Sequence, residues 1–236
     1  MHRFAVLAVV AACGSSAPTD RGKLRDVVLA INGHANVVKM TSAFADYRDV
    51  LATAKRVAGV TSAEPIVFEN ATAASPAAAN VAIEVKGVEA GGPGAGEIEK
   101  RMIEGTTAAL AEHPDEPRVI LGRGLGKQLA VHVGDEISIA ITAAIDPEHI
   151  VPARHAMRVA GFFQTDVDLY DDHVAIVPLA AAQAMLGKGD TVTALELRVA
   201  DPAAAAAIAA AVERALGGPP YRAMGWQELD PALVDR

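Results

Sequence analysis

The stretch from Val119 to Gln164 decides how this chain folds. It reads VILGRGLGKQLAVHVGDEISIAI (119–141), TAAIDPEHIVPARHA (142–156) and MRVAGFFQ (157–164). The apolar start predicts a strand, and the glycines after it predict a tight turn into a short helix. Gly134-Asp135 then predicts a second turn before an alternating strand, and MRVAGFFQ predicts a strand that returns. Two neighbouring strands joined by a long hairpin are therefore expected at the centre of the molecule.

Strand–helix–strand patterns lie on both sides of this stretch. Within residues 33–68, apolar residues at 44, 47, 51 and 54 predict a helix between two strands, the second interrupted by Pro65. Within residues 191–224 the pattern repeats, with Asp201 as the cap of the helix and Pro202 at its first position. Two such units around a strand-rich middle indicate an α+β fold with an inserted subdomain.

The expected organisation has three parts. Residues 1–22 form a leader and a polar tether, residues 23–100 and 173–236 form an α/β subdomain, and residues 101–172 form the inserted strand-rich subdomain with its hairpin at 143–156. Between the strands, the alanine-rich residues 71–79 and the glycine-rich residues 90–96 are expected to be loops.

Composition excludes several classes of function. The chain of 236 residues has 21 basic and 29 acidic side chains, a net charge of −8, and a general nucleic-acid binder needs a basic face. Its one cysteine, Cys13, permits neither an intrachain disulfide nor a cysteine metal cluster. The apolar run at residues 4–12 is too short to span a bilayer.

The N-terminus is typical of a bacterial lipoprotein. His2 and Arg3 precede an apolar segment, and Val10-Ala11-Ala12-Cys13 resembles a lipobox, in which the cysteine thiol receives a diacylglyceryl group. A polar tether follows. We expect Cys13 to be lipidated and the chain to be membrane-anchored in the periplasm, with Ser15 favouring the outer membrane. The alternatives are a buried core strand or a misassigned start.

No motif in the sequence indicates catalysis or a cofactor. Gly122-Arg-Gly-Leu-Gly126 lacks both the dinucleotide fingerprint and the Gly-Lys-Ser/Thr ending of a phosphate loop, so a strand-to-helix turn is favoured. The acidic residues at 166–172 lack the EF-hand spacing, which favours a solvated loop over a calcium site. The histidines lack zinc-site spacing, and no serine lies in a nucleophile elbow. We therefore expect a non-enzymatic protein without a metal or cofactor.

The insert at 143–156 is the most suggestive feature for binding. It contains Pro147 and Pro152 around the apolar pair Ile150 and Val151. It is either a plain hairpin loop or a projection that offers apolar side chains and unpaired backbone to a partner protein.

Several segments in their order resemble the periplasmic domain of the transmembrane subunits of lipoprotein-releasing ABC transporters (LolC and LolE), which also occurs in MacB-like permeases. The resemblance covers roughly residues 24–230. Its most specific block is LGRGLGKQLAVHVGDEISI (121–139), with NGHANVVKM (32–40), VAIEVKGVEA (81–90) and the late Trp226 matching in order and spacing.

The resemblance implies a porter-like α/β subdomain with a strand-rich insertion. It also implies that residues 144–154 correspond to a hook that binds the periplasmic lipoprotein carrier. Pro147, Ile150, Val151 and Pro152 would then contact the partner, which is that carrier or an ABC transporter complex. LolE-like relatives lack a comparable hook, so this assignment depends on the subtype.

The sequence departs from that family because family members carry membrane helices before and after this domain. We expect a free-standing, lipid-anchored domain that binds a protein in lipoprotein or envelope trafficking. A truncated permease fragment and an uncharacterised envelope hydrolase are the alternatives.

Overall fold

The computed structural model describes residues 21–40, 43–112, 116–141 and 153–229. The chain divides into two compact units. Unit 1 combines the segment up to Pro65 with the segment from Val192 onward, and unit 2 is Ile66–Thr191 between them. Unit 2 is therefore an insertion into unit 1.

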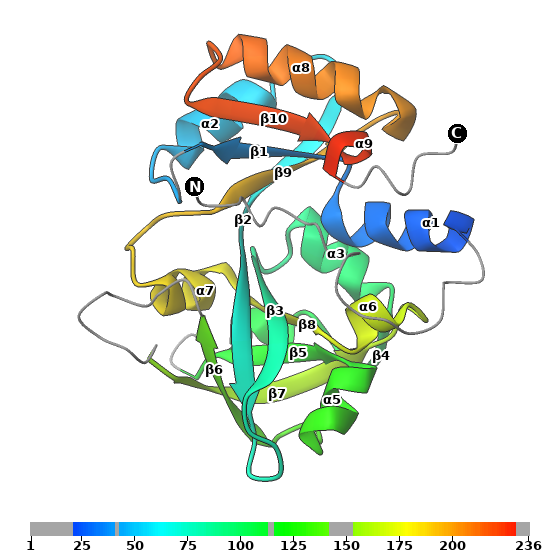
Figure 1. Cartoon of the computed structure of the whole chain (residues 1–236), viewed down its shortest axis with the longest axis vertical. Helices are drawn as coiled ribbons and strands as arrows, with labels where there is room; N and C mark the ends of the chain where they lie inside the picture. The colour runs from blue at the N-terminus through cyan, green and yellow to red at the C-terminus, as the bar shows by residue number, and fades with distance from the viewer. Residues whose placement is uncertain (1–20, 41–42, 113–115, 142–152, 230–236) are drawn as a thin grey trace. The chain divides into compact units, whose positions relative to one another are not determined.

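Unit 1 is built on a sheet whose strands lie in the order β10-β1-β9-β2 (Figure 1). The central strand β1 has two antiparallel neighbours, because Ala35 pairs with Gly225 of β10 on one side and with Leu197 of β9 on the other. The elements of unit 1 are α1 (Arg21–Asn32), β1 (Ala35–Lys39), α2 (Tyr47–Ala54), the start of β2 (Val60–Ala74), β9 (Ala194–Val199), the 3-10 helix η2 (Pro202–Ala204), α8 (Ala205–Ala215), β10 (Tyr221–Gly225) and α9 (Trp226–Leu229).

The ends of two helices in unit 1 follow from local chemistry. Gly33, directly after α1, has a φ of 68°, a conformation that favours glycine, and a Cβ there would lie 3.1 Å from the carbonyl oxygen of Leu197. Asp201 is confirmed as a cap: its Oδ1 accepts a hydrogen bond of 2.9 Å from the backbone N–H of Ala203. The capped turn is η2, which leads directly into α8.

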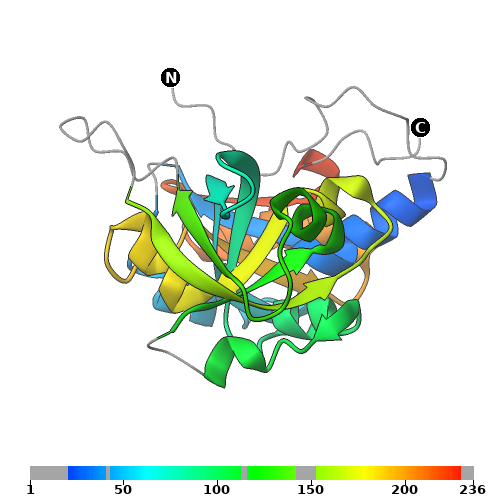
Figure 2. The same ribbon diagram turned by 90° about the horizontal axis from the view of Figure 1, so that it is seen from below.

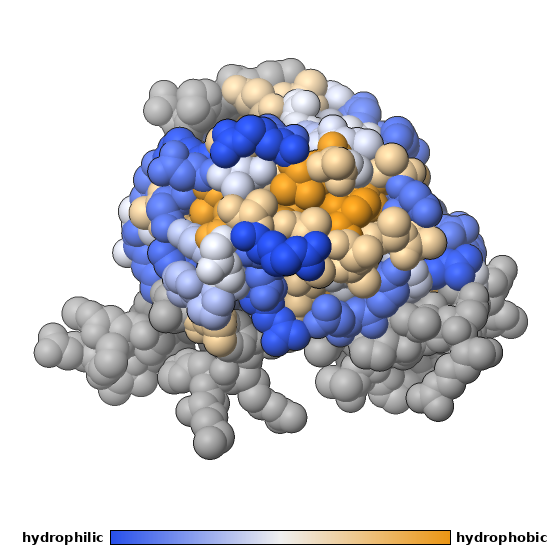
Figure 3. Space-filling model, turned by 90° about the horizontal axis from the view of Figure 1, so that it is seen from above, coloured by the Kyte–Doolittle hydropathy of each residue, from blue (hydrophilic) through white to orange (hydrophobic). Residues whose placement is uncertain are grey.

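One face of unit 1 carries apolar side chains. Figure 3 looks onto the side of the unit that α8 covers and shows apolar groups gathered near its middle. The two helices α2 and α8 contact each other, and Leu51 of α2 and Ile208 of α8 are partly exposed. Gly59 lets Ile208 approach closely, because a Cβ at Gly59 would lie 2.6 Å from its Cδ1.

The strands of unit 2 pair in a closed ring, seen from below in Figure 2. Following the pairings, β2 contacts β3, β3 contacts β8, β8 contacts β5, β5 contacts β7, β7 contacts β6, and β6 returns to β2. Strand β4 adds to β7 outside this ring. The elements are the rest of β2, β3 (Val81–Val88), α3 (Pro93–Glu99), β4 (Met102–Gly105), α4 (Ala109–Glu112), β5 (Arg118–Gly122), α5 (Arg123–Leu129), β6 (Glu136–Ile141), β7 (His155–Phe163), α6 (Asp168–Asp171), β8 (Val174–Pro178) and α7 (Leu179–Leu186).

The alternation in the sequence gives this ring its core. On β6, Ile137, Ile139 and Ile141 are at most 2% exposed, whereas Glu136 at the start of the strand is exposed and Ser138 is half-buried. Ala140, on the other face, is also buried. Successive side chains of a strand point to opposite faces, so every second residue supplies the interior. None of the helices described is both long and apolar enough to span a bilayer.

The expected α+β class is confirmed, with β1–α2–β2 and β9–α8–β10 as its two strand–helix–strand units. Some details differ from expectation. The unit boundaries lie at Pro65 and Thr191, and not at 100/101 and 172/173, because β3 and β8 are members of the ring. The expectation of a loop over 71–79 is wrong at its start, since β2 continues to Ala74. Likewise 90–96 is not all loop, because Pro93 begins α3.

Candidate docking site

The two strands that frame the insert form the pair expected from the sequence. β6 and β7 run antiparallel, with Glu136 opposite Arg158 and Ile139 opposite His155. On its other edge β6 pairs with β2, where Ala71 lies opposite Ile141. The strand that enters the insert is therefore held on both sides, so the insert begins from a fixed base.

The residues predicted to bind a partner lie outside the described part of the chain. Pro147, Ile150, Val151 and Pro152 fall within 142–152, and the lipidation residue Cys13 falls within 1–20. The described chain stops at Ile141 and resumes at Ala153. The structure therefore describes only the base of this site, which is the pair of strands β6 and β7 on either side of the insert.

Hydrogen bonds from distant segments hold the returning side of this base. The guanidinium of Arg154 donates to Asn80 Oδ1 at 2.6 Å and to Ser138 Oγ at 3.4 Å. The neighbouring Arg158 donates to Glu116 Oε1 at 2.7 Å and to the carbonyl oxygen of Gly134 at 2.7 Å. The hydrogen bond to the Glu116 carboxylate raises the pKa of Arg158.

Sequence reasoning missed these contacts, because Asn80 and Glu116 lie about 70 and 40 residues away from the arginines that they contact. The one local signal was the presence of Arg154 and Arg158 after the insert, because such side chains need hydrogen-bond acceptors.

The glycines of Gly122-Arg-Gly-Leu-Gly126 serve close packing. A Cβ at Gly122 would lie 2.4 Å from the carbonyl oxygen of Asp171, and a Cβ at Gly126 would lie 2.3 Å from the ring of Phe162. Real Cβ atoms do not approach so closely. The motif therefore brings α5 against α6 and β7, which agrees with the strand-to-helix turn expected from the sequence.

The acidic loop after β7 is organised by its own hydrogen bonds. The Asp171 carboxylate accepts from the backbone N–H of Thr165 at 2.7 Å, from its hydroxyl at 2.8 Å and from the N–H of Asp166 at 3.0 Å. Burial raises the pKa of Asp171, and these hydrogen bonds oppose that rise. Within the described ranges, no three His, Cys, Asp or Glu side chains are grouped to hold a metal ion.

Comparison with known proteins identifies the family. The model of the MacB-like periplasmic core domain matches residues 4–215. The chain belongs to this family. The match includes all of unit 2 and unit 1 up to the end of α8, and it ends before β10 and α9.

Two curated relatives are lipoprotein-releasing system transmembrane proteins. LolC of Neisseria meningitidis is 26% identical over 193 residues, which covers 80% of this chain and 45% of LolC. LolE of Haemophilus influenzae is 36% identical over 89 residues, which covers 37% of this chain and 21% of LolE. The chain thus spans less than half the length of either relative.

Two solved structures share the fold at low sequence identity. The periplasmic region of MacB from Actinobacillus actinomycetemcomitans has a TM-score of 0.53 at 11% identity and covers 91% of this chain and 99% of that one. The extracellular domain of the ABC-type transporter YknZ from Gram-positive bacteria has a TM-score of 0.53 at 12% identity, covering 82% of this chain and all of that one. The porter-like architecture implied by the sequence resemblance is therefore confirmed.

Proposed function

We propose that this chain is a non-enzymatic periplasmic domain that docks a protein partner for a lipoprotein-releasing ABC transporter system. The observation that carries this proposal is the 26% identity to LolC over 80% of the chain. The fixed base of the hairpin supports a docking role, because β6 and β7 hold both ends of the insert in place and so lower the conformational freedom that is lost on binding.

The partner in this proposal is a periplasmic lipoprotein carrier, and the contact is the hairpin 143–156. Pro147 and Pro152 restrict the backbone, and Ile150 and Val151 supply apolar area. Such a projection suits a groove on the partner that receives apolar side chains.

A capture experiment tests the hairpin. The purified chain is immobilised and exposed to the periplasmic lipoprotein carrier of the same organism. Replacing residues 146–152 with a Gly/Ser linker of equal length is expected to abolish capture and to leave the circular dichroism spectrum unchanged. The matched control replaces the exposed β2–β3 loop residues 76–79 in the same way and keeps capture. Equal capture by both variants contradicts the hairpin assignment.

We also propose that Cys13 carries a lipid and anchors the chain. A Cys13→Ala variant is expected to move from the membrane fraction to the soluble periplasmic fraction and to lose the mass of the lipid. Separation of inner and outer membranes by density then tests the outer-membrane preference that Ser15 favours. An unchanged membrane fraction in Cys13→Ala contradicts lipid anchoring.

A second form of the proposal places the domain inside a longer permease. It rests on the chain's spanning 45% of LolC. Reading the genomic DNA beyond the codon for Arg236 for apolar helices distinguishes the two forms.

A further inference from the structure

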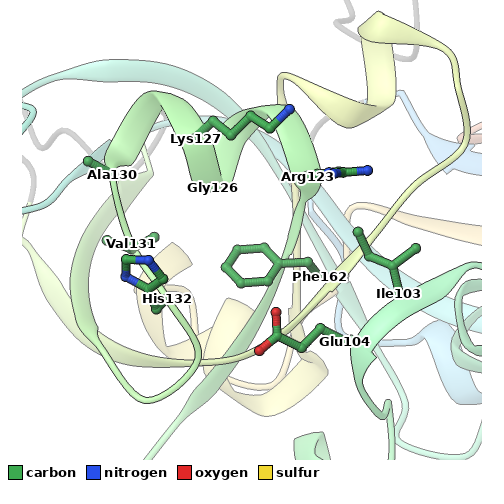
Figure 4. Close-up of a pocket in the computed structure, with 9 residues that line it drawn as sticks. All are labelled: Ile103, Glu104, Arg123, Gly126, Lys127, Ala130, Val131, His132 and Phe162. Atoms are coloured by element: carbon green, nitrogen blue, oxygen red, sulfur yellow. The ribbon is translucent and has the colours of Figure 1, made fainter.

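A hollow of about 520 Å³ lies in unit 2 between α5 and β4 (Figure 4). It is open to solvent. Its floor is the ring of Phe162 on β7, one wall is α5, and the opposite wall is β4. Its lining residues are Ile103, Glu104, Arg123, Gly126, Lys127, Ala130, Val131, His132 and Phe162. The hollow is built entirely from unit 2 and uses no residue of the hairpin 143–156.

A well-exposed apolar side chain lines this hollow. Ile103 is 51% exposed, and Val133, which follows the lining residue His132 in the sequence, is 42% exposed. Among the described residues, the other large apolar side chain with comparable exposure is Met40, which belongs to unit 1. Ile103 therefore offers a partner exposed apolar surface beside the ring of Phe162.

A β-bulge turns two consecutive side chains toward this hollow. The register of β4 against β7 shifts between Met102 and Glu104, and both Ile103 and Glu104 line the hollow. In a regular strand these neighbours would point to opposite faces, and bulges commonly re-aim side chains next to functional sites. Strand β4 also ends the strand order, with β7 as its neighbour among the described strands.

The wall formed by α5 is cationic. Arg123 and Lys127 lie one helical turn apart on α5, and Figure 4 shows both side chains along the edge of the hollow. Arg123 is oriented by Gln164, whose Oε1 accepts its hydrogen bond at 2.8 Å. Glu104 supplies a single carboxylate on the opposite wall. This cationic wall stands out on a chain whose net charge is −8.

A hollow of about 430 Å³ in unit 1 lacks this asymmetry. It is lined by two arginines and two glutamates, Arg214, Arg222, Glu213 and Glu228. Arg222 pairs with Glu228 at 2.8 Å, and Glu213 accepts a hydrogen bond of 2.9 Å from the backbone N–H of Ala223. The two positive and two negative side chains balance each other in number, so this second hollow gives no preference for an acidic or a basic ligand.

We propose that the hollow of unit 2 docks an acidic, extended segment of a partner protein. An aliphatic side chain of that segment packs on Phe162 and Ile103, and a carboxylate pairs with Lys127 and Arg123. A protein segment is favoured over a small molecule, because an open hollow cannot enclose most of a small ligand's surface. The attraction to Lys127 and Arg123 gives the contact its preference for acidic segments.

Nuclear magnetic resonance titration of the full chain tests this proposal. The probe is a short capped peptide that alternates glutamate with leucine. Two matched peptides replace either every glutamate with lysine or every leucine with serine. The acidic, leucine-containing peptide is expected to shift the signals of Ile103, Phe162 and Lys127, and the other two peptides are not. No shift at these residues, or equal shifts with the lysine peptide, overturns the proposal.

Charge reversal separates a specific contact from general attraction. Lys127→Glu is expected to lower the affinity for the acidic peptide about tenfold or more and to raise the affinity for the lysine peptide. Lys188→Glu, a reversal of an exposed charge in the same unit, is expected to change neither. If both variants lower the affinity for the acidic peptide equally, the contact is non-specific and the proposal fails.

The same signals are then followed with vesicles of phosphatidylglycerol, an anionic lipid without peptide groups. If the vesicles shift the signals of Ile103 and Phe162 and the acidic peptide does not, the hollow binds a lipid surface and the proposal is overturned. The outcome is independent of the hairpin, because replacement of residues 146–152 is expected to leave the peptide shifts unchanged.

Discussion

Replacing Glu84 with glutamine should make the chain more stable at alkaline pH and change little at acid pH. Glu84 lies on β3 in unit 2, and burial raises the pKa of its carboxyl from 4.5 to about 7. In the unfolded chain the carboxyl ionises near 4.5, so between these values the folded state holds a proton that the unfolded state has lost. Stability is therefore lost as the pH rises from about 4.5 through about 7.

The size of this effect follows from the two pKa values. At about 1.4 kcal/mol per pH unit, the loss grows to about 3 kcal/mol well above pH 7 and is below about 1 kcal/mol at pH 5. Glutamine is neutral and similar in shape, so Glu84→Gln removes this dependence. The difference in unfolding free energy between the two proteins should therefore change by about 2.5 kcal/mol between pH 5 and pH 8.

Urea denaturation followed by far-ultraviolet circular dichroism measures this difference. Fluorescence is unsuitable, because the single tryptophan, Trp226, lies in unit 1. The matched control is Glu89→Gln, which changes an exposed carboxylate directly after β3. A wild-type chain and a Glu84→Gln variant with the same pH dependence would refute the reasoning.

Substitutions at three further positions test close packing and helix ends, and each is measured by urea denaturation. Gly122→Ala should destabilise by about 2 kcal/mol or more, because the added Cβ would lie 2.4 Å from the backbone of Asp171; a loss below 0.5 kcal/mol contradicts the close packing of α5. Ala130→Gly should stabilise by about 1 kcal/mol, because Ala130 ends α5 with a φ of 52°, where glycine is favoured; a destabilised variant contradicts this. Asp201→Ala should cost about 1 kcal/mol through the lost cap on Ala203, and Asp201→Asn should recover most of it.

The sequence predicted strands and helices better than it predicted their partners. Alternation identified β6 and β7 and the hairpin between them, because a half-buried strand must alternate. It could not show that β6 also pairs with β2 and closes the ring, because alternation does not specify which edge a strand joins. Strands β3 and β8 were consequently expected in the other subdomain.

Glycine-rich composition gave a wrong prediction where one proline begins a helix. The glycine-rich 90–96 was expected to be a loop, yet Pro93 begins α3, a position that suits proline because the first helical N–H has no helical partner. The turn at Gly122 was expected, but the reason for three glycines was not. Their close neighbours, Phe162 and Asp171, lie about 40 to 50 residues later.

The hairpin that we propose as a docking site illustrates the same limit. Its location followed from two flanking strands and two prolines, which are local signals. The brace from Asn80 to Arg154 joins residues 74 positions apart and carries no local signal. The hollow over Phe162 depends on the shift in register between β4 and β7. No periodicity in the sequence predicts that shift.

The position of β1 between β9 and β10 has a consequence for synthesis. About 160 residues separate Ala35 from its partner Leu197, and about 190 separate it from Gly225, so when β1 has been synthesised, neither neighbour exists. The inserted unit is contiguous and can condense first, while β1 waits as a nascent segment with both edges open. A periplasmic chaperone that shields open strand edges would therefore matter most in the interval before the last fifth of the polypeptide arrives.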